Sequence, residues 1–166
     1  EYGAIAKGVE EKAITALLPK EPNGELMDGE VWLRWSAVTG NNGRIRTGSG
    51  ALLDNLGQWN DINTVANRIS NDFGGAVATF ANSGTYTKSG AALTEMGIAF
   101  NHTGSLQLQA GTLRLSRGGS LTGSTDVDAG ATLEMSSGAT AINGGALTLD
   151  GRLLLSGATV TESGVL

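Results

Sequence analysis

The chain has 166 residues, no cysteine, 26 glycines, two prolines and a formal net charge of −5. The absence of cysteine excludes a disulfide framework, a zinc site with thiolate ligands and a thiol nucleophile. Apolar residues make up 40% of the chain and charged residues only 16%. One apolar core can therefore form, but the scattered Lys and Arg residues lack the clustering that nucleic-acid binding requires. No apolar run is long enough for a membrane span.

Residues 1–22 predict an amphipathic helix of about four turns, because apolar residues recur at three- and four-residue spacing with charged residues opposite them. Pro19 ends this pattern. Residues 1–30, the helix and the turn after it, are expected either to cap the repeats that follow or to dock a neighbouring subunit. For docking, the candidate contact residues are Ile5, Val9 and Leu17.

The first strand is expected at residues 30–38, where apolar and polar residues alternate. Trp32 and Trp35 would point to opposite faces of this strand, so one of them belongs to the core. Neighbouring tryptophans can also stack on a sugar ring, and Trp59 is a third candidate for that role. A turn-rich segment follows, with a short strand at residues 44–47.

An apolar–Asn–Gly phrase recurs at residues 53–57, 80–84 and 100–104. We expect solenoid corners here, where Asn and Gly tolerate left-handed backbone angles and stacked Asn side chains form a hydrogen-bonded ladder. His102, at the third corner, is expected in solvent. The Asn residues of the three copies are Asn55, Asn82 and, one place earlier in its copy, Asn101.

The first two copies of this phrase are 27 residues apart, whereas the second and third are 20 apart. The longer interval predicts an insertion in one coil. The polar segment 60–68, which lacks strand alternation, is its expected position.

The clearest repeat runs from Gly104 to Leu155. Leu113, Leu133 and Leu153 are 20 residues apart, and a second apolar series keeps the same interval. A fixed period with apolar residues in register is typical of a β-solenoid. The residues expected inside it are Leu108, Leu113, Leu115, Val127, Leu133, Met135, Leu149, Leu153 and Leu155.

Three acidic residues in the repeat are candidates for chemistry. Asp126 and Asp128 share one face of a strand, and Asp150 matches Asp128 in the next coil. Such carboxylates could bind Ca²⁺ or act as an acid–base pair on a polysaccharide. The alternative, which we favour, is that they are solvent-facing charges beside a glycine corner.

Residues 156–166 begin another coil and stop before completing it. An uncovered strand edge can pair with another chain. The chain is therefore expected either to continue in a longer parent protein or to use this end for stacking, with candidate contacts Val160, Val165 and Leu166.

Two phrases, Tyr86-Thr-Lys-Ser-Gly90 and Gly111-Thr-Leu through Gly130-Ala-Thr-Leu, resemble the imperfect repeats of large exported bacterial proteins. These are the autotransporter-like and filamentous-haemagglutinin-like adhesins. The resemblance covers residues 31–166. It implies a right-handed parallel β-helix on a secreted or surface-anchored protein, and it carries over no catalytic residue.

The predicted fold class is therefore all-β, a right-handed parallel β-helix of about six coils of about 20 residues at 31–166, preceded by the helix. The predicted function is a non-enzymatic structural or adhesive protein of the extracellular space or cell surface, which assembles head-to-tail with itself. No cofactor or metal is expected, and a cell-surface glycan is the other candidate partner. The alternatives are a polysaccharide-active enzyme using the three Asp residues and a glycan-binding module using the three Trp residues.

Overall fold

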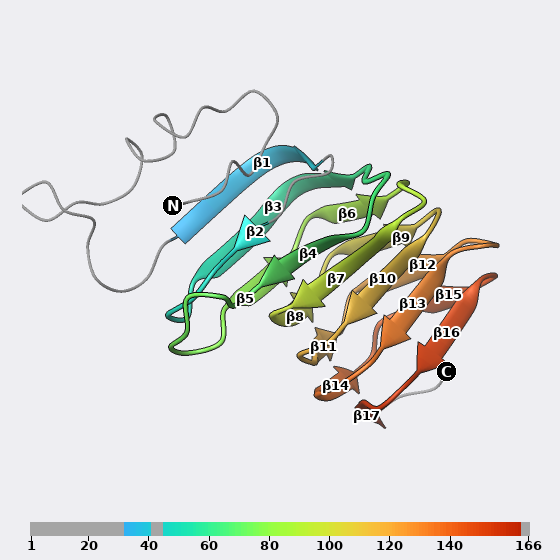
Figure 1. Ribbon diagram of the computed structural model, residues 1–166. Helices are drawn as coiled ribbons and strands as arrows, with labels where there is room; N and C mark the ends of the chain where they lie inside the picture. Colours follow the sequence, from blue (N-terminus) through green and yellow to red (C-terminus); the bar gives the residue numbers. More distant parts are fainter. Residues whose placement is uncertain (1–31, 41–44, 164–166) are drawn as a thin grey trace, which may run out of the picture.

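The computed structural model describes residues 32–40, of which only the backbone is considered, and residues 45–163. These residues form a parallel β-solenoid of about six turns, in which successive coils stack along one axis (Figure 1). The prediction of an all-β parallel solenoid with coils of about 20 residues is confirmed for this part of the chain. The predicted helix at residues 1–22 and its contact residues Ile5, Val9 and Leu17 lie outside the described residues.

The strands form three stacks along the axis. The first stack contains β5 (Thr79–Asn82), β8 (Ala99–His102), β11 (Gly119–Leu121), β14 (Ala139–Ile142) and β17 (Thr159–Glu162). The second contains β6 (Thr85–Lys88), β9 (Ser105–Leu108), β12 (Ser124–Val127) and β15 (Leu147–Leu149). The third contains β2 (Ile45–Arg46), β4 (Asn67–Ser70), β7 (Leu93–Gly97), β10 (Thr112–Leu115), β13 (Thr132–Met135) and β16 (Arg152–Leu155).

One long strand joins the first two stacks. β3 (Leu52–Asp61) pairs with β5 through its first half and with β6 through its second half. On its other edge it pairs with β1 (Trp32–Gly40), which overlaps the strand predicted at 30–38. The first and second stacks therefore form one 11-stranded sheet, which faces the six-stranded third stack across the core.

The register of the coils follows the leucine repeat. Leu113 pairs with Leu133, and Leu133 pairs with Leu153, so the residues 20 apart in sequence form one column along the axis. Since side chains alternate across a strand, the whole column points into the core. Leu113 and Leu133 are fully buried.

The extra residues of the long coil lie between β4 and β5, not at 60–68 as predicted. Residues Asn67–Ser70 pair with residues of β7 as a regular strand. The segment 71–78 that follows connects β4 to β5, whereas a single residue separates β7 from β8. Gly74 and Gly75 in this segment have positive φ angles, which a loop requires and a strand does not. Polarity was the wrong criterion, because Asn67 and Arg68 belong to a strand, on whose outer face the side chain of Arg68 is exposed to solvent.

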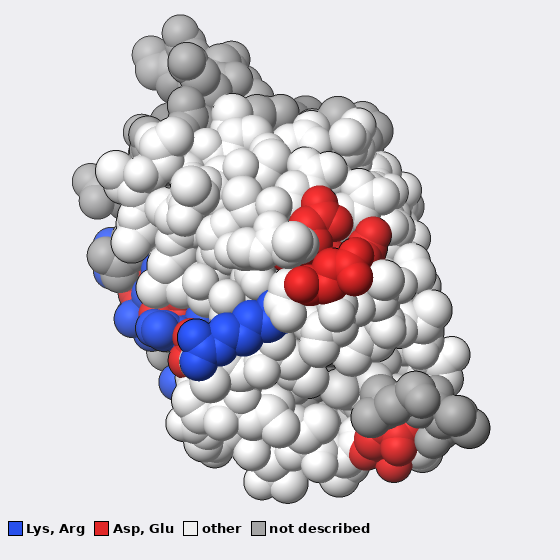
Figure 2. All heavy atoms as spheres, turned by 90° about the vertical axis from the view of Figure 1, so that its right-hand side faces the viewer, with Lys and Arg blue, Asp and Glu red and all other residues white. Residues whose placement is uncertain are grey.

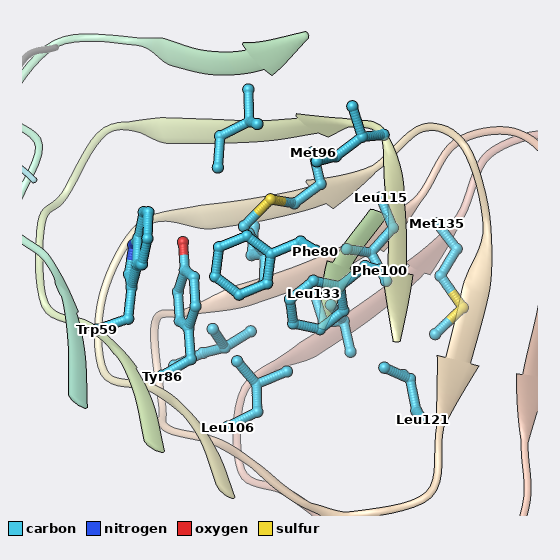
Figure 3. Packing of buried hydrophobic residues seen from close by; sticks show 14 of the residues in the cluster. Trp59, Phe80, Tyr86, Met96, Phe100, Leu106, Leu115, Leu121, Leu133 and Met135 are labelled. Atoms are coloured by element: carbon cyan, nitrogen blue, oxygen red, sulfur yellow. The ribbon is translucent and has the colours of Figure 1, made fainter. Parts of the chain in front are cut away.

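Aromatic side chains fill the core of the earlier coils (Figure 3). Trp59 lies edge-on to Phe80, with 4.8 Å between ring centroids, and stacks parallel to Tyr86 at 6.3 Å. Phe80 continues the column to Phe100 at 5.6 Å. Leucines and methionines occupy the core of the later coils, and aromatic pairs of this geometry add to the stabilisation from burial alone.

Five glycines form a column at the corner between the first and second stacks. None of them has a positive φ angle, so the predicted left-handed backbone is wrong for these corners. The requirement is space. A Cβ on Gly104 would overlap the backbone of Gly84 in the coil before, and Gly84 stands in the same relation to Gly57. The column consists of Gly57, Gly84, Gly104, Gly123 and Gly145.

Candidate functional site

The last described coil presents an uncovered apolar surface. Leu155 lies in the column of Leu115 and Met135, which are buried, yet Leu155 is 54% exposed. Leu149 follows Val127 in the second stack and is 44% exposed. Both leucines were predicted to be internal. Their exposure corrects that prediction, because among the described residues no further coil lies over β15 and β16.

The same end carries strand edges as well as apolar side chains. β15, β16 and β17 each pair with one strand only in the part of the chain described, and each pairing is parallel. Among the predicted contact residues, Val160 is partly buried against the core, while Val165 and Leu166 lie outside the described residues. An unpaired strand edge beside exposed leucines can accept another β-coil. This surface is the candidate functional site.

The other half of the solenoid holds a buried polar ladder. The Asn55 Nδ2 atom donates to Asn82 Oδ1 at 2.6 Å, and both side chains are buried. The Asn82 Nδ2 atom lies 3.0 Å from the Nδ1 atom of His102. The predicted Asn ladder is thus confirmed for the first two copies of the phrase. In the third copy Asn101 is exposed and His102 takes the ladder position, since Asn82 pairs with His102 in the register.

The prediction of a solvent-exposed His102 is wrong, because its side chain is completely buried. Its Nδ1 atom accepts from Asn82, and its Nε2 atom lies 3.0 Å from the carbonyl oxygen of Ser124 and donates to it. The neutral ring therefore has a partner at both nitrogens. Burial lowers the pKa of His102, against the opposing effect of its hydrogen bonds to Ser124 and Asn82.

His102 gives the stability of the fold a defined pH dependence. Its pKa is lower in the folded chain, so below about pH 6.5 the unfolded chain binds a proton that the folded chain does not. We expect the free energy of unfolding to fall as the pH drops below this value, by at most about 1.4 kcal/mol per pH unit. Denaturant unfolding between pH 7.5 and 5 measures this slope.

The matched variant for this prediction is His102→Asn, which keeps a ladder residue but removes the titrating ring. The chain contains one histidine. The slope should therefore disappear in the variant over the same pH range. An unchanged slope in His102→Asn would assign the pH dependence to other groups.

A buried charged network lies in the same coils as the ladder, at the other ends of β3 and β6. Lys88 is fully buried, and its Nζ atom lies 3.4 Å from the Oδ2 atom of Asp61 and 3.2 Å from the hydroxyl of Thr94. Tyr86 donates its hydroxyl to Asp61 Oδ2 at 2.9 Å, and Asn63 donates its Nδ2 to Asp61 Oδ1 at 2.8 Å. Sequence reasoning missed this network, although Lys88 lies two residues after Tyr86 and so shares its inward face.

Burial determines the protonation of this network. Burial lowers the pKa of Lys88, although the charge of Asp61 and the hydrogen bond to it act in the opposite direction. Burial also raises the pKa of Tyr86, and the nearby Asp61 raises it further. The phenol of Tyr86 is therefore neutral and donates, while the amine of Lys88 is held in a site that disfavours its charge.

On the outer face of the third stack, charges alternate in a column. Arg114 pairs with Glu95 on one side and Glu134 on the other, and its Nε atom lies 2.8 Å from Glu134 Oε2. Burial alone would raise the pKa of Glu134, but hydrogen bonds from Arg114 and Ser156 and the charges of Arg114 and Arg152 lower it overall. At the end of the column the residue beside Glu134 is Leu154, so the ion-pair pattern gives way to an apolar residue at the uncovered coil.

The three predicted acidic residues lie on the surface of neighbouring coils. Asp126 and Asp128 are exposed, and the register that pairs Val127 with Leu149 places Asp150 beside Asp128 as predicted. Figure 2 shows a group of acidic side chains on the face turned to the viewer, with a basic side chain reaching close to one edge of the group. Within the described residues, no group of three or more His, Cys, Asp or Glu side chains has an arrangement that could hold a metal ion.

Among the tryptophans, Trp59 is 4% exposed and packed among aromatic rings (Figure 3). It offers no ring face to a sugar, which corrects its place among the glycan-binding candidates. The backbone of Trp32 pairs with Leu52 and that of Trp35 with Asn55. Their side chains lie outside what the structure describes.

Comparison with protein-family models, with curated protein sequences and with solved structures finds no match for this chain. Among the described residues, no helix is long and apolar enough to cross a membrane.

Proposed function

We propose that this protein is a non-enzymatic structural or adhesive β-solenoid that assembles head-to-tail with copies of itself. The observation that carries the proposal is the uncovered coil at β15–β17. Leu149 and Leu155 are exposed there, whereas the side chains at the same positions in the coil before are buried. A second copy would extend their columns and cover both leucines.

The two ends of the described solenoid support a contact between different surfaces. At the opposite end, β1 pairs only with β3 among the described strands, so its outer edge also carries backbone donors and acceptors. Parallel pairing of that edge with the β15–β17 end of another copy repeats the pairing used between coils. A contact between unlike surfaces generates an open filament rather than a closed dimer.

The finer parts of the proposal are a right-handed winding of the coils, an adhesin-like role and a position in the extracellular space or on the cell surface. The parallel crossover rule supports the handedness, because connections between parallel strands are right-handed in nearly all cases. The phrases at 86–90 and 111–133 support the adhesin-like role through their resemblance to exported bacterial repeats.

Light scattering and electron microscopy of the purified chain test the proposal. We expect particle size to rise with protein concentration and elongated particles to be visible at the highest concentration. A chain that remains a monomer at every concentration would contradict head-to-tail assembly.

Charged residues at the uncovered coil should prevent this association. We expect the double variant Leu149→Lys with Leu155→Lys to raise the dissociation constant about 100-fold or more, because two leucines lose their burial at the contact. Sedimentation velocity over a concentration series measures the change.

Val77→Lys is the matched control. Val77 is also an exposed apolar residue, at 44%, but it lies between β4 and β5, two strands that each pair with a strand on both sides. It should associate like the unmodified chain. Equal weakening by the control and the double variant would argue against a contact located at the last coil.

A further inference from the structure

The buried network around Lys88 has the chemistry of a self-generated cross-link. Lys88 and Asn63 come from successive coils and share two partners, the carboxylate of Asp61 and the hydroxyl of Thr94. Each of the two residues contacts a different oxygen of the Asp61 carboxylate. Oδ1 accepts from Asn63, and Oδ2 lies against Lys88. An amine, a carboxamide and a bridging carboxylate are thus enclosed together away from water.

We propose that Lys88 and Asn63 form an intramolecular isopeptide bond, with Asp61 acting as the proton carrier. This inference goes beyond the proposed assembly, since it concerns a covalent bond between two coils of one chain. The cross-link would also give the buried Lys88 a role. Packing of the core does not require a lysine at this position, because the same column continues with Leu108 and Val127.

The reaction is balanced by the groups present. The ammonium of Lys88 gives a proton to the Asp61 carboxylate, and the resulting neutral amine attacks Cγ of Asn63 while the carbonyl electrons move to Oδ1. Asp61 then delivers this proton to Nδ2 and takes the second proton from Nζ, and the Cγ–Nδ2 bond breaks as the carbonyl re-forms, which leaves Asp61 protonated. The products are a secondary amide between Nζ and Cγ and one molecule of ammonia, and no oxidant or cofactor is needed.

The surroundings favour each part of this reaction. Burial lowers the pKa of Lys88, which increases the share of the nucleophilic neutral amine. Tyr86 donates to the Oδ2 atom of Asp61 and fixes the carboxylate in place. Enclosure holds the amine and the carboxamide together, and such positioning accelerates reactions between groups that are otherwise slow.

Intact-mass measurement of the folded 166-residue chain, with its fold checked by circular dichroism, tests the proposal. We expect the mass to be lower than the sequence mass by one ammonia molecule. Trypsin should fail to cleave after Lys88, and tandem mass spectrometry should find the peptides containing Asn63 and Lys88 linked. A folded chain with the full sequence mass would overturn the proposal.

Variants distinguish this cross-link from other reactions that lower the mass of the chain. Asn63→Asp and Lys88→Met should both abolish the loss of ammonia, whereas Asn143→Asp, at an exposed asparagine, should retain it. Loss of ammonia that persists in Lys88→Met would indicate cyclisation at an asparagine and contradict the cross-link. Loss of one water with a link from Lys88 to Asp61 would contradict the assignment of Asn63 as the acceptor.

Discussion

Gly104→Ala is expected to destabilise the fold by about 3 kcal/mol. The added Cβ would overlap the backbone of Ser83 and Gly84 in the neighbouring coil, where no flexible side chain can move aside. Relief requires that the two coils separate, which weakens the backbone hydrogen bonds that join them, such as that from the Gly104 amide to the Asn82 carbonyl oxygen. Chemical denaturation followed by circular dichroism measures the loss.

Gly144→Ala is the control for this prediction. Gly144 has a φ angle of 71°, but a Cβ there would have no atom within 4 Å. Only backbone strain opposes the substitution, at about 1 kcal/mol. If both variants lose the same stability, the glycine column is not a close-packed contact between coils.

Lys88→Met is expected to destabilise the fold by about 3–5 kcal/mol, because it removes the Nζ partner of Asp61 and leaves that carboxylate buried. Asp61 is 1% exposed and cannot regain water without local unfolding. The double variant Lys88→Met with Asp61→Asn removes both charges and should recover a large part of the loss. Equilibrium unfolding of the unmodified chain, Lys88→Met and the double variant measures their free energies of unfolding.

The stability of the double variant relative to that of Lys88→Met shows which change caused the loss. A double variant that is more stable than Lys88→Met shows that the unpaired carboxylate caused the loss. If the double variant is instead less stable than Lys88→Met, the buried charge is not the source of the effect, and the packing of the lysine chain is responsible.

The periodic apolar residues were sufficient to predict the solenoid. Leu113, Leu133 and Leu153 mark one column because burial selects the same residue type at each turn, and the interval then fixes the coil length. The stacked asparagines were predictable for a similar reason. Asn55 and Asn82 hold the same place in two copies of one phrase, and stacked side chains of this kind hydrogen-bond along the axis.

The polar interior of the earlier coils was not predictable from residue type. His102 and Lys88 are polar residues that sequence analysis assigns to solvent by default. The alternation of side chains along a strand does indicate that both residues point inward. His102 lies two residues after Phe100 and Lys88 two after Tyr86, so each shares the inward face of its strand. Their hydrogen-bond partners come from other coils, so these partners can be identified only in the structure.

The position of the insertion shows a different limit. The interval between Leu53 and Phe80 states how many residues are extra but not where they lie. The match of Ile69 with Met96 would have placed Asn67–Ser70 in a strand and moved the insertion to 71–78. That match is weak in sequence, because the flanking residues differ in type, with Arg68 opposite Glu95 and Ser70 opposite Gly97.

Hydrogen–deuterium exchange of the 166-residue chain at low and high protein concentration tests the central claim most directly. β10 pairs with strands on both sides, so its amides should be equally protected at both concentrations. The amides of β15, β16 and β17 that lack a partner among the described residues should exchange rapidly in dilute protein and slowly in concentrated protein, as a second copy covers them. Exchange in these three strands that does not change with concentration would contradict assembly through the uncovered coil.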